Sequence, residues 1–306
     1  MRVSLLAGAL TSFTTLTSAA LLRRQNITAS TVANVGGWVE TITVRQNGNP
    51  LLARIDTPEL WTIDLSTKKT SKLISIPGAL GLTGITEISP DQFVVVAGNF
   101  SATTFDIGIG SWAVYKVDLS GATPSATLIT KIPESGFVIG AAKFDSDTVF
   151  LADAGKGSLY RLSVSTRKYS VAFSDPTMKA PAGSFIDEGI HGIKYFDGHI
   201  CFTNTFGSTF NKVKLDGSTG EVSGPVIPIT TSGLPDPEDF VIAPDGTAYV
   251  ATFNNGVYRV SPKGEPSKYI GVGSQSSSVA FGRLEGDKDV VYISSNTGDI
   301  FSAKVN

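Results

Sequence analysis

The sequence predicts an all-β fold, a six-bladed β-propeller with four-stranded antiparallel blades, because one short strand pattern recurs six times. The pattern is a large residue followed by alternating residues that end near a turn. Its first residues lie 54, 45, 51, 47 and 43 positions apart. A period of this size matches one four-stranded blade. The six copies begin at Trp61, Tyr115, Tyr160, Asn211, Tyr258 and Phe301.

A second pattern precedes each copy and consists of two apolar runs separated by a turn. Asn47-Gly48, Asp197-Gly198 and Asp245-Gly246 stand between such runs in the first, fourth and fifth units. Asn-Gly and Asp-Gly favour tight two-residue hairpins, in which both central residues take a positive φ. We therefore expect the two inner strands of these blades to be joined by hairpins of this kind.

The C-terminus predicts how the ring closes. The last copy ends the chain after only three strands of its blade, so a fourth strand must come from elsewhere. We expect residues Thr31 to Val35 near the N-terminus to supply it, because this closure removes an exposed strand edge. A seven-bladed ring is the alternative, but the sequence holds no seventh copy of the pattern.

Composition indicates one domain over residues 21–306 and excludes some partners. The chain has 306 residues, a net charge of −2 and 41% hydrophobic residues, enough for one large core. No basic run is longer than Arg23-Arg24, so we expect no nucleic-acid partner, which would need a clustered basic surface. We also expect no membrane partner; the oligomeric state is left open between monomer and dimer.

Residues 1–20 are predicted to be a signal peptide rather than part of the fold. Arg2 gives the positive start, an apolar stretch follows from Val3 to Leu16, and Thr17-Ser18-Ala19 supplies the small residues before cleavage. The protein is therefore expected in the secretory pathway, either secreted or in a vesicle. Arg23-Arg24 is either a second processing site or a solvated start of the mature chain.

Two sequons and one cysteine fit this compartment. Asn26 and Asn99 each begin an Asn-x-Ser/Thr sequence and are weak candidates for glycosylation, since a chain of this length carries such sequences by chance. Cys201 is the single cysteine and cannot form an intramolecular disulfide. It stands in an apolar run, so we expect a buried thiol in a strand rather than a nucleophile.

Familiar catalytic motifs are absent from the sequence. It holds no Gly-x-Ser-x-Gly, no His-Glu-x-x-His, no Walker loop and no dinucleotide fingerprint. Only His191 and His199 are histidines, and His199 beside a hairpin turn is more typical of a surface role. The chemistry must therefore be sought in the geometry of the predicted ring.

In a propeller the innermost strands begin at one mouth of the channel, and the second strands end there. Polar residues converging on that mouth are the default site hypothesis. The candidates at first-strand starts are Glu40, His191, Glu238, Asp239 and Ser278, and those at second-strand ends are Arg54, Asn99, Asp153 and Asn204.

Several of these residues have an equally plain structural explanation. Asp153 and Asn204 each follow an apolar strand and could simply cap a turn. A glycan on Asn99 would point that residue outward and exclude it from the channel. Glu238 and Asp239 adjoin each other, so they either bind a cation, raise the pKa of one carboxyl, or lie in a solvated loop.

Six segments of the chain are similar to those of a known family: Glu40-Thr41-Ile42-Thr43-Val44-Arg45, Pro58-Glu59-Leu60-Trp61, Val95-Val96-Ala97-Gly98-Asn99-Phe100, Asp175-Pro176-Thr177-Met178, Gly192-Ile193-Lys194 and Phe202-Thr203-Asn204-Thr205. From about Val39 to Ile293 the chain thereby resembles fungal secreted proteins of the gluconolactonase and senescence-marker-protein superfamily. The resemblance is specific for the fold and subfamily but not for the reaction.

The resemblance implies where a metal would lie. Lactonases of the superfamily hold one divalent cation with a Glu, an Asn and an Asp at three first-strand starts. Glu40 matches the Glu, while His191 and Glu238 stand at the Asn and Asp positions; a further Asn position falls near Ile139, which cannot ligate a cation. We therefore expect no cofactor as first choice, and Ca²⁺ or Zn²⁺ on Glu40, His191 and Glu238 only if the protein is a lactonase.

The fungal subfamily also includes hetero-Diels–Alderases, which join a tropolone quinone methide to a sesquiterpene such as humulene without a metal. Such a pocket must hold two partners in a reactive pose and polarise one carbonyl. The resemblance then implies Arg54, His191 and Asn204 as hydrogen-bond donors to the developing oxyanion. Predicted substrate contacts are Glu40, Phe100, Asp153, Phe206, Asp239, Phe253 and Ser278.

Three hypotheses follow, in this order. The first is a metal-independent cyclase of fungal secondary metabolism, which predicts a largely apolar channel with a few donors. The second is a metal-dependent lactonase or esterase, which predicts a tight carboxylate-rich cation site. The third is a non-catalytic propeller that binds a ligand or a protein, which predicts a filled channel and an exposed apolar patch elsewhere.

Overall fold

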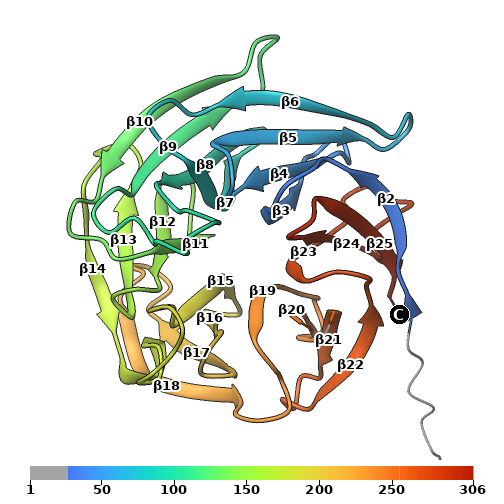
Figure 1. The fold of residues 1–306 in the computed structure, drawn as a ribbon. Coiled ribbons are helices and arrows are strands. Elements are labelled where there is room, and N and C mark those ends of the chain that lie inside the picture. Colours follow the sequence, from blue (N-terminus) through green and yellow to red (C-terminus); the bar gives the residue numbers. More distant parts are fainter. Residues whose placement is uncertain (1–26, 255, 306) are drawn as a thin grey trace, which may run out of the picture.

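The protein is a six-bladed β-propeller, as the sequence predicts. The computed structural model describes residues 27–254 and 256–305, and their strands form six sheets around a central channel (Figure 1). The one helical turn in these ranges is the 3₁₀ segment Pro176–Met178, and no helix in them is long and apolar enough to span a membrane. The predicted signal peptide, Arg23-Arg24 and the sequon at Asn26 lie outside the described residues.

Each blade is an antiparallel meander of four strands that run outward from the channel. Blade one comprises β3 (Val39–Val44), β4 (Pro50–Arg54), β5 (Glu59–Asp64) and β6 (Lys69–Ser75). Blade two comprises β7 (Gly81–Ser89), β8 (Gln92–Gly98), β9 (Ala113–Asp118) and β10 (Ser125–Lys131). Blade three comprises β11 (Val138–Lys143), β12 (Thr148–Asp153), β13 (Ser158–Ser163) and β14 (Tyr169–Ser174). Blade four comprises β15 (Ile190–Phe196), β16 (His199–Asn204), β17 (Thr209–Leu215) and β18 (Val222–Thr230). Blade five comprises β19 (Pro237–Ile242), β20 (Ala248–Thr252), β21 (Gly256–Val260) and β22 (Pro266–Gly271). Blade six comprises β23 (Ser276–Phe281), β24 (Val290–Ser295) and β25 (Asp299–Lys304), and is completed by β2 (Ser30–Asn34).

The N-terminal segment closes the ring and contacts two blades. Strand β2 pairs antiparallel with β25, so the predicted fourth strand of blade six is confirmed within one residue at each end. Just before it, β1 (Ile27–Thr28) pairs in parallel with β22 at the outer edge of blade five. The segment therefore bridges blades five and six, a contact that the sequence pattern does not reveal.

Apolar side chains pack between neighbouring blades rather than in one central core. The described residues form six buried clusters, one for each pair of adjacent blades around the ring. Trp112, fully buried, lies in the cluster between blades two and three. Cys201 is buried between blades four and five, where burial raises the pKa of its thiol to about 12, as expected for a structural cysteine.

The predicted inner hairpins are present, but two of them have a different turn. Asp197 and Gly198 both take a positive φ, of 46° and 72°, as the sequence predicts. In blades one and five only Gly48 and Gly246 take a positive φ. There the chain makes a longer turn that ends with glycine in the left-handed region, which is the usual three-residue hairpin with a bulge. Expecting two-residue turns at these two sites was wrong.

Candidate active site

The six innermost strands present one equivalent residue each to the channel. In every blade the first strand pairs with the end of the second, and its register then shifts by a β-bulge. A bulge turns the following side chain away from the regular alternation of the strand. The residues at this position in blades one to six are Glu40, Thr83, Ile139, His191, Glu238 and Ser277.

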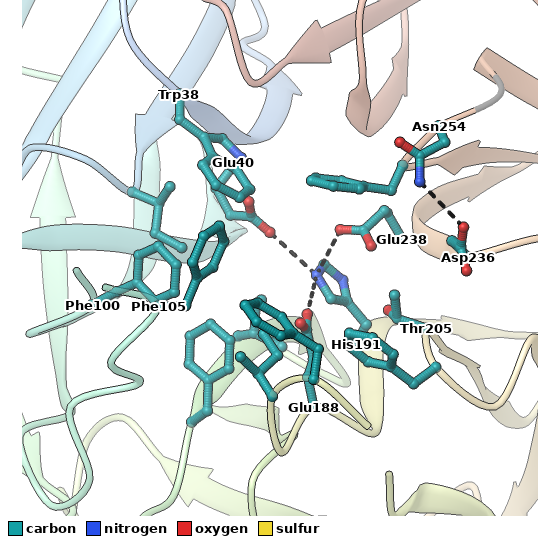
Figure 2. Close-up of a pocket in the computed structure, with 17 residues that line it drawn as sticks. Trp38, Glu40, Phe100, Phe105, Glu188, His191, Thr205, Asp236, Glu238 and Asn254 are labelled. Carbon is teal, nitrogen blue, oxygen red and sulfur yellow. Dashed lines mark hydrogen bonds and ion pairs between the residues drawn. The ribbon is translucent and has the colours of Figure 1, made fainter. Parts of the chain in front are cut away.

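His191 is surrounded by three carboxylates. Its Nε2 lies 3.0 Å from Oε2 of Glu238, 3.2 Å from Oε1 of Glu188 and 3.3 Å from Oε1 of Glu40 (Figure 2). The four side chains come from three separate blades and are at most 10% exposed. We refer to Glu40, Glu188, His191 and Glu238 as the imidazole cluster. The expectation that residues at first-strand starts converge therefore placed Glu40, His191 and Glu238 together correctly.

Both ring nitrogens of His191 lack a well-aligned hydrogen bond among the described residues, and so does Oε1 of Glu40. The three short contacts of Nε2 are thus charge contacts that share one nitrogen, which can donate only one proton. A buried polar atom without an aligned partner is rare in folded proteins, and a catalytic role or a bound water or ion is a common reason for one. The cluster is therefore arranged to receive a further polar group.

Burial and charge set the ionisation of the cluster. Burial lowers the pKa of His191, but the charge of Glu238 and the contacts with Glu238 and Glu40 outweigh it and hold this pKa well above its usual value. Burial raises the pKa of Glu188 to about 8, which the charge of His191 offsets only in part. Burial likewise raises the pKa of Glu238. At neutral pH the cluster then offers two proton donors, the imidazolium and the neutral Glu188 carboxyl.

The same residues fit a divalent cation. One ligand atom each from Glu40, His191 and Glu238 lies within 4.8 Å of the other two, and two of these atoms lack hydrogen-bond partners. An imidazole nitrogen with carboxylate oxygens suits Zn²⁺, whereas Ca²⁺ prefers six or more oxygens. A cation held here would polarise a carbonyl or lower the pKa of a bound water. Ile139 supplies no ligand, as the sequence predicts.

The other wall of the site is aromatic. The imidazole cluster lines a pocket of about 280 Å³ together with Trp38, Phe100, Phe105, Phe137, Phe185, Phe206 and Phe253 (Figure 2). Trp38 contacts both Phe100 and Phe253, with ring centroids 5.9 Å apart in each pair. At the rim Phe105 and Phe185 meet edge to face at 5.3 Å. The pocket thus combines one charged cluster with a broad apolar surface.

The predicted residues at the ends of the second strands do not line this pocket. The guanidinium of Arg54 donates two hydrogen bonds to Asp56. The amide of Asn204 donates to the carbonyls of Thr177 and Lys179 and accepts from the amide of Gly207.

Asp153 is likewise engaged in a loop, where it is fully buried and accepts hydrogen bonds from three backbone amides. The expectation that second-strand ends such as Asp153, Arg54 and Asn204 face the channel mouth needs this correction: their polar groups fix loops instead. Asn99 is exposed, and its glycosylation stays a prediction.

The remaining predicted residues divide between two layers. Glu40, His191, Phe100, Phe206 and Phe253 line the pocket, as expected. Asp239 and Ser278 lie one residue further along their strands and contact each other on the opposite side of His191 from the pocket.

Sequence reasoning missed Glu188 and most of the aromatic wall. Glu188 lies in the loop just before β15, two residues ahead of the strand, where no strand pattern marks it. Its position three residues before His191 is the one signal that could have indicated it. Trp38 and Phe137 stand directly before the first strands of blades one and three, so the rule for first-strand starts would have found them if extended by one residue.

The fold and site together define a six-bladed propeller with a partly aromatic pocket at one mouth of its channel, and sequence comparison adds two relatives. A candidate hetero-Diels-Alderase of a Phoma species is 29% identical over 297 residues, covering 85% of this chain and 84% of the relative. The candidate hetero-Diels-Alderase asR5 of Sarocladium schorii is 24% identical and covers 87% and 76%. No protein-family profile matches the chain. The predicted resemblance to proteins of this name is thus confirmed.

Solved structures confirm the propeller. The calcium-binding protein regucalcin of Agrobacterium tumefaciens superposes with a TM-score of 0.66 at 17% identity, over 90% of this chain and 96% of that one. A candidate gluconolactonase superposes with a TM-score of 0.69 at 12% identity, over 92% and 93%. At these identities the likeness concerns the fold alone.

Proposed function

We propose that the protein is a cyclase of secondary metabolism that catalyses a hetero-Diels–Alder reaction without a metal. The observation that carries the proposal is a buried imidazole among carboxylates that shares one 280 Å³ pocket with a wall of aromatic rings. The names of the two sequence relatives support the same reaction. The substrates would be a conjugated carbonyl compound, acting as the heterodiene, and an apolar alkene.

The reaction needs little covalent help from the protein. One carbon–carbon and one carbon–oxygen bond form while three π bonds become one, and no atom leaves. The enzyme must hold the two reactants in a reactive orientation and stabilise negative charge that develops on the carbonyl oxygen. Here His191 Nε2 donates a hydrogen bond to that oxygen, and the neutral carboxyl of Glu188 is the second donor in reach of the same position.

The aromatic wall binds the alkene and excludes water. Trp38, Phe100 and Phe253 form a continuous surface on which a hydrocarbon alkene can pack. Their packing excludes water from the heterodiene, which would otherwise add water and be lost. The alkene is then oriented by shape, since a hydrocarbon can make no use of the one polar group of these three rings, the buried indole N–H of Trp38. Face selectivity of the cycloaddition follows from this arrangement.

The test is a rate measurement with a heterodiene generated in solution and an excess of an apolar alkene. The proposal expects saturable acceleration of cycloadduct formation by the purified protein, and loss of that acceleration in His191→Gln. Lys304→Met is the matched control, because it removes an exposed ion pair far from the channel. Equal rates with and without the wild-type protein would contradict the proposal.

A second candidate function is metal-dependent hydrolysis of a lactone. It is favoured by the three ligand atoms of Glu40, His191 and Glu238 that converge within 4.8 Å. Elemental mass spectrometry of the purified protein, before and after a chelator, separates the two functions. About one bound Zn²⁺ or Ca²⁺ per chain, lost together with lactone hydrolysis, would replace the cyclase proposal with this one. A protein without metal that keeps its cyclase activity would exclude it.

A further inference from the structure

A second polar layer backs His191 on the side away from the pocket. Asp239 is almost completely buried and accepts two side-chain contacts, from Lys194 Nζ at 2.5 Å and from Ser278 Oγ at 2.7 Å. These residues lie on β19, β15 and β23, so three blades hold one carboxylate in place. None of the three lines the aromatic pocket. The proposed cycloaddition therefore makes no direct use of this costly buried charge.

A small void separates the two layers. It measures about 10 Å³ and is lined by His191, Thr41, Lys194 and Asp239 together with backbone of the central strands. A methyl group on Gly140 would meet the carbonyl oxygen of His191 at 2.3 Å, so the strands can approach this closely only with glycine there. A void of this size with two to four polar neighbours holds one water molecule.

His191 Nδ1 supplies the missing partner for such a water. His191 lines both the pocket and the void, and its Nε2 is already held among the carboxylates on the pocket side. Nδ1 lies across the ring from Nε2, is buried, and has no hydrogen-bond partner among the described residues. Leaving a buried N–H unpaired is unfavourable, and a water in the void would give this donor a partner.

We propose that one water molecule in this void links His191 Nδ1 to Asp239, and that Asp239 and Lys194 act through it as positioning residues for the imidazole. The water accepts from Nδ1–H and donates to the Asp239 carboxylate, and Thr41 is a third polar residue that lines the void. The ring is then held from both sides, by carboxylates around Nε2 and by water at Nδ1. This inference deepens the proposed function, because it explains how His191 keeps its donor aimed at the substrate.

The opposite mouth of the channel gives the water a route to solvent. A second pocket of about 270 Å³ lies there, and it shares Thr41, Ile85, Ala141 and Lys194 with the void. The far-face pocket therefore adjoins the void, and the proposal expects the water to exchange with solvent from this side while substrate fills the aromatic pocket. The site is dry on the substrate side and hydrated behind the imidazole.

Nuclear magnetic resonance of labelled histidine tests this link without any substrate. The chain has only two histidines, so His199, which lies at the edge of β16 outside the channel, serves as an internal reference. In chelator-treated protein, Asp239→Asn should shift the Nδ1 resonance of His191 and speed exchange of its proton with solvent. His199 should not change. Thr41→Val, which removes only a hydroxyl, should produce a smaller change of the same kind.

Two outcomes would overturn the proposal. If His191 Nδ1 is unaffected in Asp239→Asn, Lys194→Met and Thr41→Val while these variants remain folded, the second layer is merely structural. If Asp239→Asn fails to fold, the Nδ1 resonance of His191 is measured in Thr41→Val and Lys194→Met instead, and an unchanged resonance in both overturns the proposal. Lys304→Met is the control for loss of an ion pair elsewhere.

The activity measurement keeps this inference separate from the proposed function. Asp239→Asn should lower kcat for cycloaddition about tenfold with KM unchanged, since the residue touches no substrate. If the wild-type protein is inactive but Asp239→Asn shows the expected resonance shift, the cyclase proposal is wrong and the water link stands. If the wild-type protein is active but Asp239→Asn shows no shift, the water link is wrong and the cyclase proposal stands.

Discussion

The two walls of the pocket are built in different ways. The imidazole cluster is almost wholly on the innermost strands β3, β15 and β19, and its residues there are at most 6% exposed. The aromatic rim lies on loops, and Phe185 is 74% exposed. Groups that need an accurate position are placed on the rigid scaffold, whereas groups that select by shape are placed where loops can vary. The comparison predicts large effects on rate from the first wall and effects on selectivity from the second.

The largest expected effect is on rate, from removing the imidazole. His191→Ala should slow cycloaddition by about 10²–10³-fold, the usual cost of losing one donor to a developing oxyanion. The change also leaves the buried carboxylates around it without their counter-charge, so the melting temperature should fall. Addition of free imidazole should restore part of the rate, because the space of the side chain remains.

A matched variant makes this result interpretable. His199→Ala removes the other histidine, whose Nδ1 contacts only the backbone carbonyl of Asp197. It should leave the rate unchanged. If His191→Ala is folded and as active as the wild-type protein, the polar wall is not the chemical part of the pocket.

The next effect concerns stability and pH. The pKa of Glu188 is raised to about 8, so the folded state binds this proton more tightly than the unfolded state does. Its contribution to stability is complete below the unfolded pKa of about 4.3 and is lost as pH rises towards 8. Glu188→Gln copies the neutral carboxyl and cannot ionise. Its stability relative to the wild-type protein should therefore increase between pH 5 and pH 8 and level off above.

Chemical denaturation of chelator-treated protein at a series of pH values measures this difference. Glu285→Gln is the control, because that carboxyl is 91% exposed and pairs only with Lys288 on the surface. A constant difference between Glu188→Gln and the wild-type protein across the range would show that Glu188 is ionised throughout, and would remove it as a proton donor.

A smaller effect is expected on selectivity, from the aromatic rim. Phe185→Ala removes the edge-to-face contact with Phe105, which is worth about 1 kcal/mol, and should reduce discrimination between two alkenes of different shape about fivefold. Its melting temperature should stay close to that of the wild-type protein, because Phe185 is mostly exposed. Competition between the two alkenes in one reaction measures the ratio.

Val171→Ala is the control for this change, since Val171 is also exposed but lies on the outer strand β14. A large fall in rate with unchanged selectivity in Phe185→Ala would mean that the rim takes part in the chemical step, and the division between the two walls would fail.

The smallest expected effect is at Arg54. Its guanidinium is bound to Asp56 and does not line the pocket, so Arg54→Ala should change the rate less than about threefold. A steady-state rate assay under saturating alkene measures this. A loss of the size expected for His191→Ala would return Arg54 to the site and show that the loop opens when substrate binds.

The ring and the centre of the site could be predicted from the sequence because both depend on repetition. Six copies of one strand pattern gave the blades, and their equivalent first-strand positions gave Glu40, His191 and Glu238. A strand fixes the direction of its side chains, so a position in the repeat predicts a place in the channel.

Residues outside the repeat could not be placed in this way. Glu188 reaches the cluster from a loop whose path no periodic pattern describes. Arg54 and Asn204 stand where the repeat predicts channel residues, yet their side chains donate hydrogen bonds to nearby groups in the loops instead. Local hydrogen bonds of this kind depend on the loop conformation and not on the strand pattern.

The most direct test of the account is the stereochemistry of the cycloadduct formed by chelator-treated protein. Elemental mass spectrometry first establishes that the sample holds no metal, and chiral chromatography then measures the enantiomeric excess. The account predicts one dominant enantiomer from the wild-type protein and a nearly racemic product from His191→Ala, because the slowed enzymatic reaction then leaves most of the product to the uncatalysed reaction in solution. A racemic product from folded, metal-free wild-type protein would contradict the account.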